Sequence, residues 1–244
     1  GAGDDTVEVQ AGAGAAATVD GGTGRDTIRL TGTGTGSLAA PTAVEILDVA
    51  GGSWSVAGSA AYDAITVRDD ATVTSGLVID RDDRVTIEAG GTLSVSTNAI
   101  TWAGGGNAVL TNAGLAAVTS GNRLLQVNAG ATGTLTIDNL AGGVLQGAIN
   151  PSQAGAATAS ITLNNAGTIE ANGRVIDFRS FDNNGASGTI NNLAGGIIRQ
   201  TGTNTDVIRP GQNGVVNNWG TITAEAGAVG GGDLIDFQSE TGGK

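Results

Sequence analysis

The sequence predicts an all-β chain folded as a right-handed parallel β-helix of about nine rungs, with a repeat of about 27 residues. The first observation is a row of short β-rich segments that end at Asn112, Asn139, Asn165, Asn192 and Asn218, so that successive positions differ by 27, 26, 27 and 26. The second is a series of apolar pairs, out of phase with the first, that ends at Ile100, Leu125, Ile149, Ile176, Ile208 and Ile235. The third is composition: 43 Gly and only 3 Pro among 244 residues exclude collagen and suit many tight corners.

Each repeat holds about three short runs in which apolar and polar residues alternate, a period that indicates strands. Stacked rungs lie about 4.8 Å apart, so each strand is expected to pair in parallel with its equivalent one repeat later. The inward side chains would then form aliphatic ladders from Leu135, Ile137, Ile161, Leu163, Ile190 and Val216. Asn tolerates the left-handed backbone of sharp corners, and stacked Asn side chains can hydrogen-bond along the axis. We therefore interpret the Asn row as structural in preference to a ligand-binding ladder.

Residues 1–244 are expected to form one continuous β-helix segment with a change of rung style near residues 80–90. Residues 1–90 contain no Asn and carry 14 acids against 5 bases, whereas residues 91–244 contain 18 Asn. The strand pattern continues through the change, and no linker divides the chain. Because the sequence opens inside a motif, we expect it to be a fragment of a larger protein.

Two Gly-rich turns in the acidic part match a calcium-binding pattern. Residues 21–29 fit the nine-residue β-roll motif at every specified position, through Gly22, Gly24 and Asp26, and residues 1–7 fit a copy shortened at its start, with Asp5. The separation of Asp5 from Asp26 is close to the length of one short rung, so they could stack and coordinate Ca²⁺. The alternative is that Gly-rich turns with a hydrogen-bonding Asp simply make good corners.

The densest charge cluster contains Asp80, Asp82 and Asp83, in residues 79–84. Clustered carboxylates can perform acid–base glycoside chemistry. Consecutive residues of an extended chain point to opposite faces, however, so a solvated charged corner is the favoured interpretation. His and Cys are absent, which excludes Ser–His–Asp and Cys–His nucleophilic sites and a His/Cys zinc site.

Aromatic side chains, the usual platforms for carbohydrates, are few. The chain has seven: Trp54, Tyr62, Trp102, Phe178, Phe181, Trp219 and Phe237. Trp219 follows the last Asn of the row and is expected to fill the core or a corner. Phe178 and Phe181 lie in the longest interval between repeats and are the candidates for a surface binding spot.

The net charge of −12 disfavours nucleic acid and anionic membranes as partners, because an acidic surface repels phosphates. The uncharged stretch from Ala89 to Asn122 is interrupted throughout by Gly, Asn, Thr and Ser. A membrane span needs roughly 20 predominantly apolar residues, so this stretch does not qualify.

The motifs Gly3-Asp-Asp-Thr-Val-Glu-Val and Asn191-Asn-Leu-Ala-Gly-Gly-Ile-Ile resemble repeats in the passenger domains of autotransporters of Gram-negative bacteria. Similar units along essentially the whole chain carry the resemblance. It implies an adhesin-like passenger exported through a C-terminal outer-membrane barrel, which is expected in the full-length protein, and displayed at the cell surface. Filamentous haemagglutinin-like adhesins use similar units.

The expected function is therefore an extracellular structural or adhesive stalk without catalytic activity and without a cofactor other than the possible Ca²⁺. Its partner would be a glycan or protein on a host or bacterial surface, or another copy of the chain. Two alternatives stay open: a β-helix that binds or degrades polysaccharide, and a subunit of a surface layer or filament.

Overall fold

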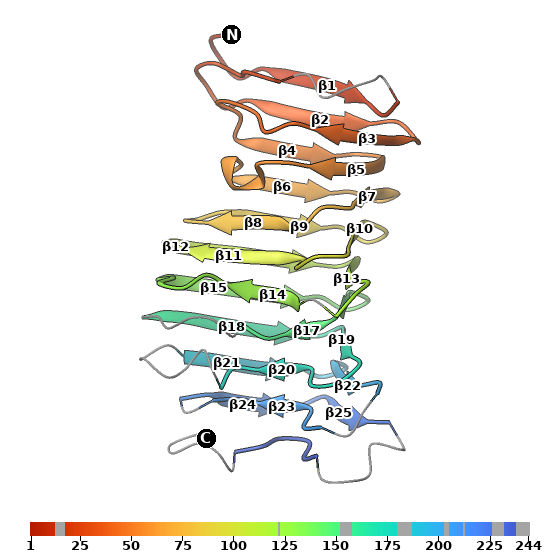
Figure 1. The fold of residues 1–244 in the computed structure, drawn as a ribbon, viewed down its shortest axis with the longest axis vertical. Coiled ribbons are helices and arrows are strands. Elements are labelled where there is room, and N and C mark those ends of the chain that lie inside the picture. Colours follow the sequence, from red (N-terminus) through yellow and green to blue (C-terminus); the bar gives the residue numbers. More distant parts are fainter. Residues whose placement is uncertain are drawn as a thin grey trace.

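The computed structural model describes residues 1–12, 18–121, 123–151, 158–179, 187–202, 205–211, 213–225 and 232–237. Within these residues three parallel sheets of ten, nine and six strands run along one long axis (Figure 1). Each strand pairs in parallel with a strand of the next rung, and apart from β1 and β2 the paired strands are not consecutive in the chain. The fold is therefore the predicted parallel β-helix.

The ten-stranded sheet contains, in spatial order, β1 (Thr6–Gln10), β2 (Thr27–Thr31), β4 (Ile46–Val49), β6 (Ala64–Val67), β9 (Arg84–Ile87), β12 (Gly106–Asn112), β15 (Gly133–Asn139), β18 (Ala159–Asn165), β21 (Ser187–Asn192) and β24 (Val215–Asn218). The nine-stranded sheet contains β3 (Thr35–Leu38), β5 (Gly52–Val56), β7 (Ala71–Val73), β10 (Thr92–Val95), β13 (Leu115–Val118), β16 (Val144–Gln146), β19 (Thr168–Ala171), β22 (Ile197–Gln200) and β25 (Thr221–Ala224). The six-stranded sheet contains β8 (Leu77–Asp80), β11 (Ile100–Gly104), β14 (Arg123–Val127), β17 (Ala148–Ile149), β20 (Ile176–Asp177) and β23 (Ile208–Arg209). One 3-10 turn, η1 (Ser59–Ala61), is also present in the described residues.

The strand register confirms both periodic series of the sequence. Asn112 pairs in turn with Asn139, Asn165, Asn192 and Asn218 along the ten-stranded sheet. The apolar series from Ile100 to Ile235 likewise pairs member to member through the six-stranded sheet. Residues that are one repeat apart in the sequence are therefore paired neighbours in the sheet.

The first rungs are shorter than the predicted repeat. One register position of the ten-stranded sheet is occupied in steps of 21, 19, 18 and 20 by Thr6, Thr27, Ile46, Ala64 and Arg84. From Arg84 onward the equivalent position recurs in steps of 25, 27, 26, 27 and 26, at Val109, Thr136, Thr162, Thr189 and Val215. The third sheet begins only at β8, so the rungs that begin with β2 and β4 have two strands each. As a result the longest sheet has ten strands in the described chain, against about nine rungs expected.

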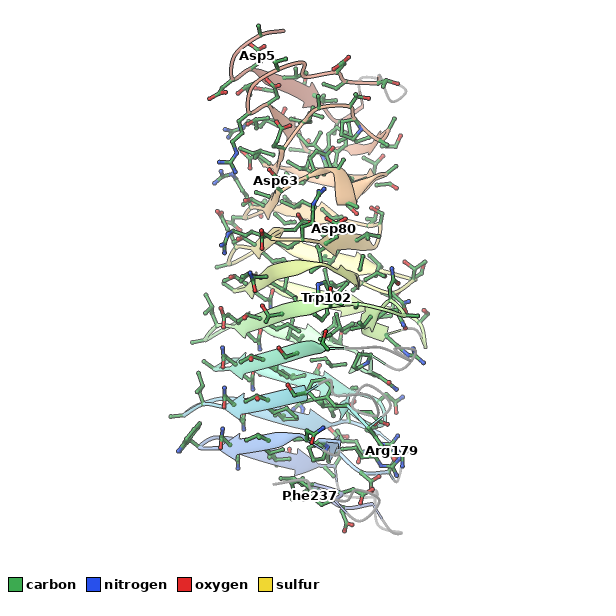
Figure 2. The ribbon with its side chains drawn as sticks, turned by 90° about the vertical axis from the view of Figure 1, so that its left-hand side faces the viewer. Asp5, Asp63, Asp80, Trp102, Arg179 and Phe237 are labelled. Atoms are coloured by element: carbon green, nitrogen blue, oxygen red, sulfur yellow. The ribbon has the colours of Figure 1, made fainter. Side chains whose placement is uncertain are left out.

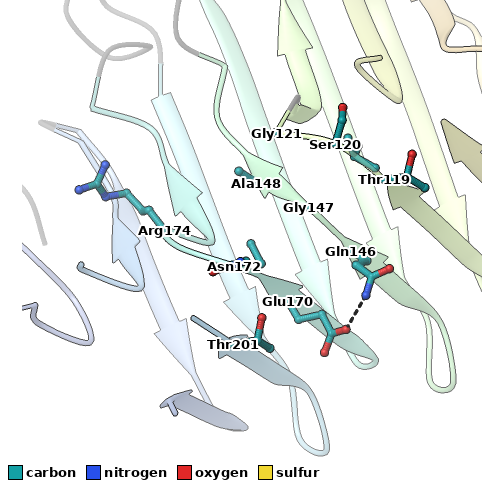
Figure 3. A pocket seen from close by; sticks show the side chains of 12 residues that line it. Thr119, Ser120, Gly121, Gln146, Gly147, Ala148, Glu170, Asn172, Arg174 and Thr201 are labelled. Atoms are coloured by element: carbon teal, nitrogen blue, oxygen red, sulfur yellow. Dashed lines mark hydrogen bonds between the residues drawn. The ribbon is translucent and has the colours of Figure 1, made fainter. Parts of the chain in front are cut away.

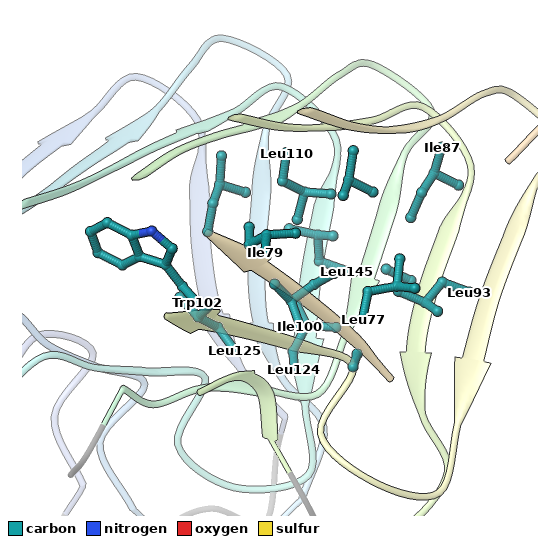
Figure 4. Close-up of a cluster of buried hydrophobic side chains, with 14 of the residues drawn as sticks. Leu77, Ile79, Ile87, Leu93, Ile100, Trp102, Leu110, Leu124, Leu125 and Leu145 are labelled. Carbon is teal, nitrogen blue, oxygen red and sulfur yellow. The ribbon is translucent and has the colours of Figure 1, made fainter. Parts of the chain in front are cut away.

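The interior is aliphatic, and side chains from all three sheets meet in it (Figure 4). Along β15 and β18 the inward positions alternate with outward Thr and Ser, as the sequence predicts. The ladder members Leu135, Ile137, Ile161, Leu163 and Ile190 are at most 2% exposed. Such an interior is stabilised by burial of apolar area, at roughly 25 cal/mol per Å².

Buried aromatic rings occupy places where the ladder lacks a side chain. Gly188 pairs with Ile161, an aliphatic position, yet a Cβ on Gly188 would lie 2.2 Å from the Phe178 ring. Phe178 is fully buried. In the N-terminal part, Trp54 lies in the same way over Gly36. Each ring therefore occupies the space in the core that a side chain at the glycine would fill.

The Asn row forms a continuous hydrogen-bond ladder that is buried from Asn112 to Asn192 and exposed at its last member, Asn218. The Nδ2 atom of Asn112, Asn139 and Asn165 donates to the Oδ1 of the next member at 2.8 Å, and Asn192 donates to Asn218 at 2.7 Å. The same nitrogen also donates to the backbone carbonyl of the first residue of a strand in the nine-stranded sheet. For Asn165 this acceptor is the carbonyl of Ile197, at 3.2 Å. Each amide thus holds one corner and joins two rungs.

Outward-facing ladders change character along the axis. Arg68 lies between Asp48 on one side, at 2.5 Å, and Glu88 on the other, at 3.3 Å. In later rungs the register position of Asp48 on the ten-stranded sheet is occupied by Asp138, Asn164, Asn191 and Asn217, which are joined by side-chain hydrogen bonds of 2.8 to 2.9 Å. The outer face therefore passes from ion pairs to amides.

No helix among the described residues is long and apolar enough to cross a membrane.

The Asn ladder predicts a sharp contrast within one strand. Replacing Asn165 with Ala removes one ladder hydrogen bond from Asn139, one from Asn192 and the bond to the Ile197 carbonyl in a dry environment, so the free energy of unfolding should fall by about 2–4 kcal/mol. Asn164 is adjacent but half-buried on the outer face, and Asn164→Ala should cost less than about 1 kcal/mol. Urea unfolding followed by circular dichroism compares the two. Equal losses would contradict a special role for the buried row.

The contact of the Phe178 ring with Gly188 predicts that an aliphatic side chain at position 188 lowers the stability of the protein. Gly188→Ile should lower the melting temperature because the new side chain overlaps the ring, a cost of about 1–3 kcal/mol or more. Adding Phe178→Ala removes the overlap, so the double variant should be more stable than the sum of the two single losses predicts. Strictly additive losses in thermal unfolding would show that the two residues do not share one space.

Candidate functional site

The two calcium-like turns lie on adjacent rungs. Ala2 forms a parallel bridge with Thr23, and a Cβ on Gly22 would lie 2.0 Å from the carbonyl oxygen of Gly1. A Cβ on Gly24 would lie 2.4 Å from the carbonyl oxygen of Gly3. Gly is therefore required at these positions by the close approach of the preceding turn.

The Asp side chains of these turns bond to backbone groups across the rungs. Asp26 is 2% exposed, and its Oδ1 accepts the Asp5 N–H at 2.8 Å, while its own N–H donates to Glu45 Oε2 at 2.7 Å. The Asp5 carboxylate is exposed and lies 3.6 Å from the amino group of Gly1. These contacts are those of a corner in which carboxylates hold N–H groups that start a strand.

Calcium at Asp5, Asp26, Gly22 and Gly24 stays a proposal. The Oδ2 of Asp26 is buried and has no hydrogen-bond partner in the described chain. The described residues nevertheless contain no group of three Asp, Glu, His or Cys side chains that could hold a metal ion. Native mass spectrometry should show a Ca²⁺ adduct, and EDTA should lower the melting temperature, if the ion binds. Absence of both effects would remove the proposal.

The acids of the charge cluster point in different directions. Asp83 is 3% exposed and accepts the Asp80 N–H through Oδ2 at 2.7 Å. Asp82 is exposed, and its Oδ1 accepts the Asn107 N–H one rung later at 2.8 Å. Burial raises the pKa of Asp83 to about 6, with a further rise from the nearby charge of Asp80. Figure 2 shows Asp80 and Asp63 in the upper half of the rod, far along the axis from Arg179 and Phe237.

A surface hollow of about 450 Å³ adjoins this cluster. It is lined by Arg25, Asp63, Ala64, Arg81, Asp82, Asp83 and Arg84. The carboxyl group of Asp83 is used to fix the turn at residues 80–83 and is almost covered. Its raised pKa follows from burial in the corner, which is a structural cause.

The raised pKa of Asp83 predicts a pH-dependent stability. Its ordinary pKa is 3.8, so between about pH 4 and pH 6 the folded chain binds more protons than the unfolded chain, and stability falls as the pH rises. Asp83→Asn keeps an acceptor for the Asp80 N–H and cannot ionise. It should stabilise the protein by about 1–3 kcal/mol at pH 8 and by little at pH 4. Asp82→Asn is the matched control, with no comparable gain in urea unfolding at either pH. A pH-independent effect of Asp83→Asn would contradict this assignment.

Two predictions about aromatic residues are wrong. The sequence predicts Phe178 at the surface, but its ring fills the core above Gly188. Phe181 lies outside the described residues. Trp219 is predicted to fill the core or a corner, but it is 63% exposed. It follows Asn218 at a corner position shared with Leu140 and Leu193, which are also exposed, so the side chain after each Asn faces solvent.

An open groove at another corner is not predicted by the sequence analysis. It lies between the nine-stranded and six-stranded sheets and has a volume of about 610 Å³. We call it the corner groove. Its lining comes from four successive rungs: Val118, Thr119, Ser120 and Gly121; Gln146, Gly147 and Ala148; Glu170, Ala171, Asn172 and Arg174; and Thr201.

Unequal corner lengths create the corner groove. Four residues separate β13 from β14 and four separate β19 from β20, but Gly147 alone connects β16 to β17. Gly147 has a φ of 136°, a backbone that L side chains rarely adopt, and its N–H donates to the Glu170 carbonyl at 2.8 Å. Figure 3 shows Gly147 and Ala148 between Ser120 and Asn172. The short corner is therefore the floor and the longer corners are the walls.

A signal for the corner groove exists in the sequence. The step from Leu125 to Ile149, which is 24, is the shortest in the apolar series, and the next two steps are 27 and 32. Because rungs stack in register, a short rung beside longer ones must leave a hollow at a corner. The interval alone does not show which corner shortens.

Charges in the corner groove are balanced by neighbouring side chains. Glu170 accepts a hydrogen bond from Gln146 at 3.1 Å (Figure 3) and also pairs with Arg199. Arg174 pairs with Asp177 at 2.9 Å and with Asp206 at 3.3 Å. The groove therefore presents hydroxyl and amide groups together with ions that are already paired.

Comparison with known proteins gives no match to this chain among family models, curated proteins or solved structures. The fold and the site geometry together describe a β-helical rod with a polar groove across four rungs.

Proposed function

We propose that this chain is a stiff extracellular stalk of a bacterial surface protein, with a structural or adhesive role. The observation that carries the proposal is the continuous register of the ten-stranded sheet through the described chain. Ten strands at about 4.8 Å give a rod of roughly 43 Å for this segment alone. Buried amides and aliphatic ladders join every later rung to the next, which suits a part that resists bending.

The setting of the stalk is proposed from the resemblance of its repeats to autotransporter passengers. It would be displayed at the surface of a Gram-negative cell, with an outer-membrane barrel in the full-length protein. Its partner would be a surface glycan or protein, or a second copy of the chain. The acidic charge favours partners other than nucleic acid.

Polysaccharide degradation is the second candidate, and one observation favours it. Asp83 has a pKa raised to about 6 beside a hollow that Asp63 and Asp82 also line. A carboxylic acid with a raised pKa close to a second carboxyl group is the pairing that glycoside hydrolysis needs. The small exposed area of Asp83 weighs against contact with a substrate.

Electron microscopy and an activity assay test these functions together. Purified protein should appear as isolated short rods, and a panel of polysaccharides should show no new reducing or unsaturated ends. Ordered filaments or sheets would replace the stalk with a surface-layer subunit. New chain ends that disappear in Asp83→Asn and Asp82→Asn variants would replace it with an enzyme.

A further inference from the structure

We propose that the corner groove binds a neutral oligosaccharide segment that lies along the rod axis. The proposal rests on the stalk function for its setting and gives the adhesive role a ligand class and a place. Three properties of the groove support it: its shape, the chemistry of its lining, and its charge.

The shape fits a short linear chain. The lining comes from four successive rungs, which extend over about 14 Å along the axis. The floor is formed by Gly147 and Ala148, and Ala171 lies beside it, so the small side chains leave room for a ring-sized group. A volume of about 610 Å³ lies within the range of small-molecule sites. An elongated ligand of several linked rings would fill it better than a compact one.

The lining is amphipathic in the way that a sugar is. Val118, Ala148 and Ala171 offer apolar surface, against which the C–H faces of a pyranose can pack. Asn172 is exposed and makes no side-chain hydrogen bond within the described residues, so its amide can both donate to and accept from hydroxyl groups. Thr119 donates its hydroxyl proton to the Val95 carbonyl at 3.1 Å and so meets a ligand as an acceptor.

Charge selects a neutral ligand. Arg174, the cation of the lining, is committed to Asp177 and Asp206, and Glu170 is committed to Arg199. An anionic glycan would have to displace a carboxylate from Arg174, in a chain whose net charge of −12 already repels anions. A neutral polyhydroxylated chain meets neither obstacle.

The lining residues in the described chain include no aromatic ring, so each contact is expected to be weak. Many stalks displayed on one surface would bind a repeating glycan with increased avidity. The test therefore uses immobilised protein at high density as well as isothermal calorimetry in solution. Probes are neutral oligosaccharides of glucose, mannose and N-acetylglucosamine, with polygalacturonate and hyaluronan oligosaccharides as anionic probes.

Ala148→Gln is the variant that fills the floor. Ala148 is half-buried in β17, and Arg123 occupies the equivalent position one rung earlier, so a longer side chain is compatible with the strand. Affinity for the neutral probe should fall by about tenfold or more. Asn172→Ala is a second variant at an exposed position, which should also weaken binding if Ala148→Gln fails to fold. Thr162→Gln, on the outer face of β18 away from the groove, is the matched control and should bind as the unaltered protein does.

Three outcomes overturn the proposal. The first is that no neutral probe binds to the dense surface. The second is that anionic probes bind better than neutral ones. The third is binding that both groove variants leave unchanged but Trp219→Ala abolishes, which would place the glycan on the exposed ring of Trp219 instead. None of these results bears on rod shape, so the stalk function would stand or fall separately.

Discussion

Every rung of this fold must repeat the backbone of the rung before it, because each strand pairs in parallel with its equivalent one repeat later. Side chains at one register position are therefore stacked at the strand spacing, about 4.8 Å. A position must be filled by groups that tolerate their own copy as a neighbour: aliphatic side chains inside, amides that donate to one copy and accept from the other, and alternating charges outside. The Asn row, the aliphatic ladders and the outward ion pairs of Arg29 with Asp48 and of Arg68 with Glu88 all satisfy this single constraint.

Departures from exact repetition produce the distinctive features. At Gly188 the ladder loses a side chain, and Phe178 fills the space from another sheet. At Gly147 a corner shrinks to one residue, and the longer corners around it leave an open groove. The ladders hold the sheets in register across such a change, so the chain can vary its surface without altering its interior. This division between a repetitive interior and variable corners gives the rod an open groove at one corner.

Much of the fold could be predicted because residues that recur at a fixed interval in the sequence are paired neighbours in the sheets. The spacing of Asn112 to Asn218 located one strand in each of five rungs, and the apolar series located another. The early rungs have no such marker and are shorter, so their number was underestimated. The predicted positions of Phe178 and Trp219 were wrong because they depend on neighbours in space. Phe178 is buried because Gly188 has no side chain, and Trp219 is exposed because it follows the Asn at its corner. The corner groove could be predicted only by comparing the lengths of three adjacent corners, and the sequence intervals do not show which corner is short.

The buried Asn side chains form one hydrogen-bonded ladder that joins the rungs. Hydrogen exchange of the Asn side-chain amides, followed by nuclear magnetic resonance after transfer into heavy water, tests this ladder most directly. The amide protons of Asn139 and Asn165 are buried and bonded on both sides, so they should persist far longer than those of Asn164 and Asn191, which are bonded in the same way on the outer face. Equal and rapid exchange in the two rows would contradict the account.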